Sequence, residues 1–66
     1  MHADILIVRD GEGYRVLFGH LRLATVLSMS REVCVDIKGE GKASIIKTSS
    51  GLIVDKDSQQ LPLLGH

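Results

Sequence analysis

The chain has 66 residues, eight basic and eight acidic side chains with a formal net charge of zero, and one cysteine. A chain of this length forms one domain, residues 1–66, and buries only about 60 % of the surface that its unfolded form exposes. One cysteine excludes an internal disulfide, and the balanced, intermingled charge excludes a polybasic tract for binding nucleic-acid phosphates.

The apolar content is high for so small a domain, at 44 % of residues, and Tyr14 and Phe18 are the only aromatic side chains. Because a large exposed apolar patch is a liability on a monomer, we expect a homo-oligomer. Near the N-terminus the longest apolar run is Ile5-Leu6-Ile7-Val8, far shorter than the roughly 20 residues that span a membrane. Without a visible targeting segment, and with a single thiol, the sequence predicts a soluble, cytoplasmic protein with no membrane partner.

The first predicted strand covers residues 3–9, and Gly11-Glu12-Gly13 follows it. Two glycines two positions apart supply the positive-φ residues that a tight hairpin loop needs. The second predicted strand, residues 14–18, alternates between two faces. Its expected core face carries Tyr14, Val16 and Phe18.

Residues 20–31 fit two interpretations. As a helix, Leu23, Val26, Leu27 and Ser30 share one face, but His20 is a poor N-cap and no glycine ends the segment. As a strand, the period-two alternation is stricter, and Gly19 becomes a bulge or corner. The strand interpretation is favoured.

The second half of the chain repeats the pattern of an apolar strand followed by Gly-Glu-Gly. Strands are predicted over residues 32–38, with Val33, Val35 and Ile37 inward, and over residues 42–48. A turn at residues 49–51 leads to another strand at residues 52–55.

Residues 56–66 are predicted to form a loop and an apolar C-terminal tail. The tail contains Leu61-Pro62-Leu63-Leu64, and its proline has no N–H to donate within a sheet. We therefore expect the tail to dock in a groove or on a neighbouring subunit.

Short strands with turns every eight to twelve residues indicate an all-β fold, a small barrel or roll of five to six short antiparallel strands. The alternative is an α+β fold with one helix at about residues 20–31.

The sequence has no motif that indicates a catalytic or cofactor-binding site. Neither Gly-Glu-Gly has the third glycine of a dinucleotide loop or the Ser/Thr of a Walker loop. The soft metal ligands show no paired spacing, and nothing in the sequence gives the thiol a base. These ligands are His2, His20, Cys34 and His66. The sequence predicts a protein that is not an enzyme, with no catalytic, cofactor-binding or metal site.

The favoured function is a non-enzymatic protein-interaction or assembly module that forms a homo-oligomer. Its candidate interface residues are Leu6, Val8, Leu61, Leu63 and Leu64. The alternative is a small RNA- or DNA-binding β-domain whose basic side chains contact the nucleic-acid backbone. The candidate contacts for that alternative are Arg15, Arg22, Lys38, Lys42 and Lys47.

The stretch KGEGKASIIKTSSGLIVD, residues 38–55, resembles the C-terminal hairpin of tryptophan-activated RNA-binding attenuation proteins. The resemblance implies a β-roll that assembles into rings and contacts RNA. It covers less than a third of the chain, and Asp36 stands where a basic, RNA-contacting residue is expected, so the chain is not assigned to that family.

Overall fold

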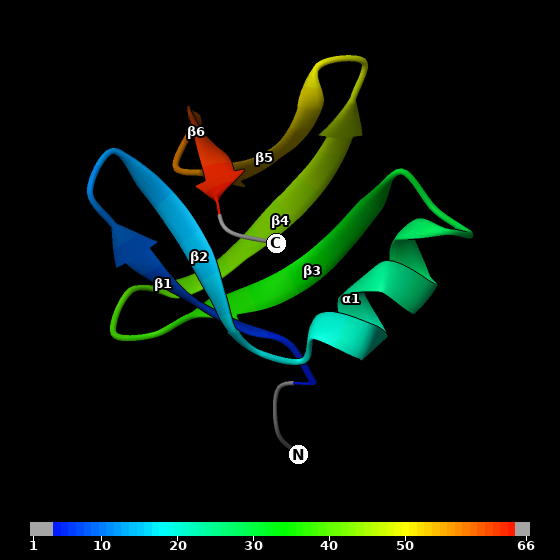
Figure 1. The fold of residues 1–66 in the computed structure, drawn as a ribbon. Coiled ribbons are helices and arrows are strands. Elements are labelled where there is room, and N and C mark those ends of the chain that lie inside the picture. Colours follow the sequence, from blue (N-terminus) through cyan, green and yellow to red (C-terminus); the bar gives the residue numbers. More distant parts are fainter. Residues whose placement is uncertain (1–3, 65–66) are drawn as a thin grey trace.

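A computed structural model describes residues 4–64. They form six strands and one helix, and the strands close into a barrel in the order β1-β2-β6-β5-β4-β3 (Figure 1). The elements are β1 Leu6–Asp10, β2 Gly13–Phe18, α1 His20–Leu27, β3 Glu32–Ile37, β4 Gly41–Thr48, β5 Gly51–Lys56 and β6 Gln59–Leu64. The small barrel expected from the sequence is confirmed.

The sequence predicted a wholly antiparallel barrel, but two of its strand pairings are parallel. β1 pairs with β3 in parallel, and so do β2 and β6, each over two residue pairs. Strands β1, β3 and β5 therefore run in one direction, and β2, β4 and β6 in the other. This topology brings the β1–β2, β3–β4 and β5–β6 turns to one end of the barrel, which we call the hairpin end. In Figure 1 these three turns lie on the left and α1 lies on the right.

The expectation of a strand at residues 20–31 was wrong. β1 lies between β2 and β3 in the barrel, so every strand position is taken and the chain must cross the end of β1 to reach β3. It does so as α1, which packs against β3 and buries Leu23 and Leu27, one turn apart. Gly19 is the N-cap residue in a left-handed conformation, with φ of 94°.

The expected loop and tail at residues 56–66 was also wrong for the part that the structure describes. β6 pairs with β5 and then with β2. Asp57 and Ser58, both at positive φ, form a two-residue hairpin loop between the paired Lys56 and Gln59. Two positive-φ residues match a type I′ turn, which asparagine and glycine form more readily, so the sequence signal was weak.

The core fills the barrel and continues under α1 with aliphatic side chains and Tyr14. As expected, Val35 and Ile37 point inward, and Val33 is half-buried and packs against the core. The least exposed large side chains are Ile7, Tyr14, Ile37, Ile45 and Val54.

Candidate interaction surface

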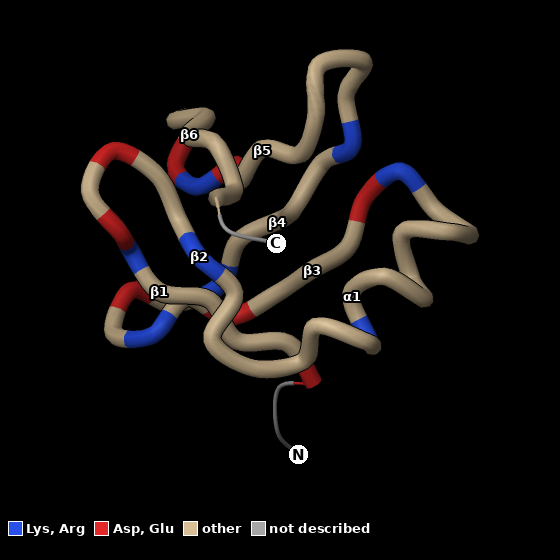
Figure 2. The backbone as a smooth tube through the Cα atoms, viewed as in Figure 1, with Lys and Arg blue, Asp and Glu red and all other residues tan. Residues whose placement is uncertain are grey.

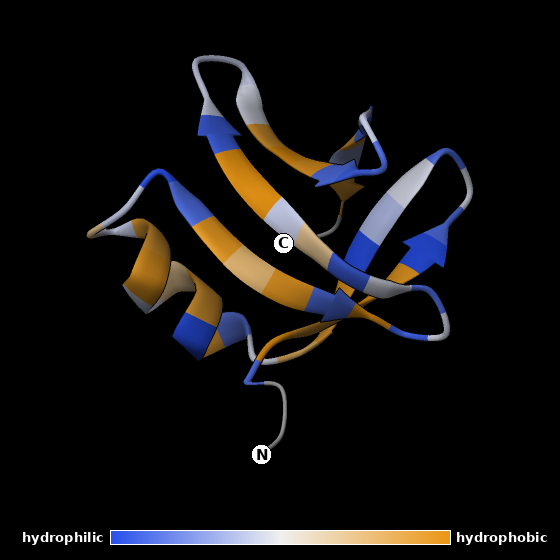
Figure 3. Cartoon of the chain, turned by 180° about the vertical axis from the view of Figure 1, so that it is seen from behind, coloured by the Kyte–Doolittle hydropathy of each residue, from blue (hydrophilic) through white to orange (hydrophobic). Residues whose placement is uncertain are grey.

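The outward sides of β1 and β2 and the end of β6 form a mostly apolar surface, which we call the outer face. Cross-strand pairing places Leu6 beside Phe18, Val8 beside Arg15, and Arg15 beside Leu64. The outer face therefore consists of Leu6, Val8, Asp10, Arg15, Leu17, Phe18 and Leu64. Figure 3 shows that hydrophobic residues of β1 and β2 lie toward α1, and hydrophilic ones toward the hairpin end.

A β-bulge in β2 exposes the largest apolar side chain of this surface. Leu6 lies opposite Phe18 and Ile7 opposite Val16, so Leu17 is an extra residue in the ladder. Such an extra residue shifts the alternation by one position. The expectation that Phe18 points into the core was therefore wrong. Phe18 is 62 % exposed and Leu17 is 44 % exposed.

An ion pair crosses the outer face. The Arg15 Nε donates to Asp10 Oδ2 at 3.2 Å, and both side chains are about half exposed. Apolar neighbours surround Arg15, with Val8 and Leu64 opposite it on the two adjacent strands and Leu17 two residues further along β2. The outer face thus combines apolar area with one acid and one base.

Of the predicted interface residues, three lie on the outer face. Leu6 and Val8 are half-buried there, and Leu64 is 40 % exposed. Leu61 is half-buried against the core. Leu63 was misplaced by the prediction, because it is a core residue, 4 % exposed, and offers no surface to a partner.

Sequence reasoning missed Leu17 and Phe18, together with Leu21 at the start of α1, which is highly exposed. Leu17 and Phe18 are two adjacent large apolar residues, and strict alternation places only one of them in the core. Their adjacency was therefore the sequence signal that one of the two is exposed.

The predicted nucleic-acid contacts are mostly engaged within the chain. Arg15 pairs with Asp10, Arg22 with Asp4 at 3.6 Å, and Lys42 with Asp36 at 3.0 Å. The hydrogen bond to Asp36 raises the pKa of Lys42. The Lys47 ammonium donates to the Leu27 carbonyl at 3.2 Å and so ties the end of α1 to β4.

Lys38, in the β3–β4 turn, is the one candidate whose side chain has neither an ion pair nor a hydrogen bond within residues 4–64. Figure 2 shows acidic and basic residues alternating around the hairpin end rather than a basic field.

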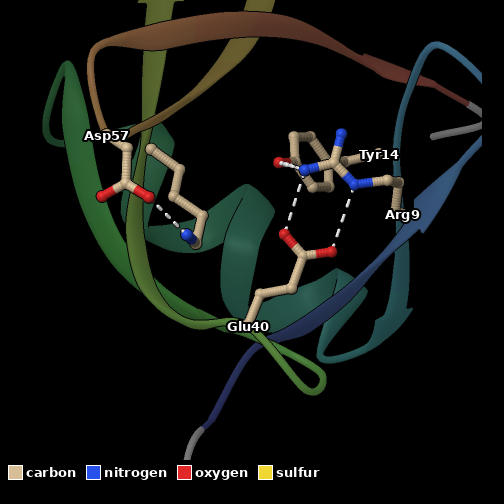
Figure 4. A network of polar contacts seen from close by, with 5 residues as sticks. Arg9, Tyr14, Glu40 and Asp57 are labelled. Carbon is tan, nitrogen blue, oxygen red and sulfur yellow. Dashed lines mark hydrogen bonds and ion pairs between the residues drawn. The ribbon is translucent and has the colours of Figure 1, made fainter.

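A polar network closes the hairpin end (Figure 4). The Arg9 guanidinium donates to both carboxylate oxygens of Glu40, at 3.1 and 3.0 Å, and to the Tyr14 hydroxyl at 2.8 Å. Its Cζ also lies 4.8 Å from the centroid of the Tyr14 ring. The hydrogen bond from Arg9 lowers the pKa of Glu40, and the same bond raises the pKa of Arg9. The second Gly-Glu-Gly therefore has a structural role beyond its turn.

We expect Glu40→Gln to destabilise the fold in a pH-dependent way. Because the pKa of Glu40 is lower in the folded chain, its ionised form stabilises the fold above the unfolded value of about 4.3, and this contribution is lost as the pH falls through the folded value. Urea unfolding should give a difference in unfolding free energy between wild type and variant that is largest near pH 7 and shrinks below about pH 4. Glu12→Gln, in the first Gly-Glu-Gly, is the matched control. Parallel pH profiles for all three proteins would contradict the role assigned to Arg9–Glu40.

Residues 4–64 contain no cluster of side chains suited to binding a metal ion. No three His, Cys, Asp or Glu side chains are placed to hold a metal ion there. Cys34 is a free, exposed thiol on β3. His2 and His66 lie outside the described residues.

In the described part of the chain, no helix is long and apolar enough to cross a membrane. Compared with known proteins, the chain matches no protein-family model, and no curated protein or solved structure is significantly similar to it.

Proposed function

We propose that this protein is a non-enzymatic protein-interaction module whose docking surface is the outer face. The observation that carries the proposal is the β-bulge at Leu17, which leaves Phe18 in solvent although strict alternation would bury it. Bulges are over-represented at sheet edges, at the rims of barrels and next to active sites, where they re-aim a side chain.

The composition of the outer face supports this function. Interface centres are enriched in aromatic residues and arginine, and energetically dominant residues are drawn from the same types. Phe18 and Arg15 provide one of each, on rigid strands rather than on loops. Figure 2 shows charged residues at the hairpin end and also on α1 and at the start of β3.

Binding of RNA or DNA is the alternative function, and it has weaker support. Four of its five candidate side chains already have a partner within the chain. A phosphate would have to displace a carboxylate from Arg15, Arg22 and Lys42.

The cytoplasmic location expected from the sequence stays a prediction.

The proposal is tested by photo-crosslinking in the cells that produce the protein. With p-benzoylphenylalanine in place of Leu17, we expect light-dependent protein adducts that Phe18→Ser abolishes. The control places the same probe at Met29, which is 76 % exposed in the turn between α1 and β3. Equal adducts at both positions, or none at position 17, would contradict a docking role, and adducts to nucleic acid alone would favour the alternative.

A further inference from the structure

We infer that the outer face docks on the outer face of a second copy of this chain, giving a two-fold symmetric dimer. This inference rests on the proposed function and names its partner. In such an interface the same surface is used by both subunits, so it must be complementary to itself.

The charges of the outer face meet that condition. Its ionic groups are one base and one acid, Arg15 and Asp10, whose polar atoms lie 3.2 Å apart and whose side chains are half exposed. Under a two-fold axis, each Arg15 can bind the partner's Asp10 without leaving a charge unmatched. The chain has a formal net charge of zero, so two copies approach without net repulsion, and such proteins associate readily.

The apolar area is sufficient for a dimer at the small end of the stable range. The exposed fractions are 62 % for Phe18, 44 % for Leu17 and 40 % for Leu64, while Leu6 and Val8 are half-buried. Taking about 200 Å² for a fully exposed large side chain, the outer face presents roughly 350 Å² of apolar surface. The smallest stable interfaces bury about 600 Å² per partner, of which about 57 % is apolar. The two apolar areas agree, and a dimer of this size is expected to dissociate in the micromolar range.

The first measurement is the mass of the purified chain in solution. Sedimentation velocity and light scattering are recorded from about 1 to 300 μM, a range that brackets micromolar dissociation. A reducing agent is present because exposed Cys34 could otherwise form disulfide-linked dimers. We expect wild type to shift from monomer to dimer, and Phe18→Ser to raise the dissociation constant about 30-fold or more. Met29→Ser is the matched control for removing an exposed apolar side chain, and should leave the constant within about twofold.

The second measurement tests the two-fold pairing. Asp10→Arg puts two bases on the outer face and Arg15→Asp puts two acids there, so each variant alone should be monomeric. An equimolar mixture should form a heterodimer, because each face then meets the opposite charge. Far-UV circular dichroism of each variant establishes that it is folded, and Phe18→Ser added to either member should abolish the heterodimer.

The outcomes separate this inference from the proposed function. A wild type that stays monomeric throughout, a Phe18→Ser variant that dimerises as well as wild type, or charge variants that do not associate when mixed would overturn the two-fold dimer. If adducts specific to position 17 then contain a different protein, the docking surface stands and the second copy does not. Absence of such adducts as well would overturn both.

Discussion

Replacing Gly19 with alanine is expected to remove about 2–5 kcal/mol of folding free energy. The left-handed conformation costs a non-glycine residue about 1–2 kcal/mol, and crowding in a packed site costs about 1–3 kcal/mol more. Both apply at Gly19, whose φ is +94°, because an added Cβ would overlap the Asp4 carbonyl oxygen and lie 2.9 Å from the Cα of Ile5. Domains of this size have on the order of 3–10 kcal/mol in total, so the substitution should remove a large fraction of the unfolding free energy.

Gly11→Ala separates the two causes. Gly11 also has a positive φ, of 61°, but nothing lies within 4 Å of the position of its Cβ. Alanine there should cost only the conformational part, about 1–2 kcal/mol. Urea denaturation followed by circular dichroism gives both values, and equal costs would show that the approach of the Asp4 and Ile5 backbone to Gly19 carries no energy.

The same close approach explains why sequence reasoning misassigned the segment that follows. The sequence predicts Gly19 as a bulge in a long strand. The residues around a glycine in the sequence do not show which backbone segment packs against it in the fold. In the structure the backbone of Asp4 and Ile5, just before β1, passes beside Gly19, where β2 has ended and α1 begins. The hydrophobic pattern of a short segment carries no information on a contact with residues far away in the chain, such as that of Asp4 and Ile5 with Gly19.

Hairpins with glycine in the turn were predictable, and the hairpin without one was not. Both Gly-Glu-Gly segments adjoin turns at the same end of the barrel, with Gly11, Gly39 and Gly41 at positive φ. The turn at Asp57 and Ser58 adopts similar angles without glycine, so the propensity signal for β6 was missing. Pairing of β6 with two other strands compensates for an unfavourable turn.

The candidate site was predictable only in part, because period-two alternation assigns a face to each residue only while the register holds. Leu6 and Val8 follow the alternation and were assigned to the surface, as the structure has them. Phe18 lies beyond the bulge, where the face inverts, and was assigned to the core. The exposure of Leu17 and Phe18 therefore depends on the register between β1 and β2, which the sequence alone does not give.

Leu63→Ala is expected to cost about 2–5 kcal/mol, the range for truncating a buried leucine. Leu63 is 4 % exposed and belongs to the barrel core, opposite Tyr14 across the β2–β6 pairing. That pairing covers two residue pairs, and Gly13 permits it, since a Cβ there would lie 2.6 Å from the Pro62 carbonyl oxygen. Loss of the Leu63 side chain therefore weakens the seam that closes the barrel.

Leu64→Ala, one residue further, is the matched control. Its side chain is 40 % exposed on the outer face, so truncation should cost about 1 kcal/mol in the monomer. Urea unfolding at two protein concentrations distinguishes the two residues further, because a dimer is stabilised by mass action. The cost of Leu63→Ala should be the same in a Phe18→Ser background, whereas that of Leu64→Ala should fall there and rise with concentration in the otherwise wild-type chain. If both truncations cost the same and neither depends on concentration, then β6 does not divide its side chains between a core and a docking surface.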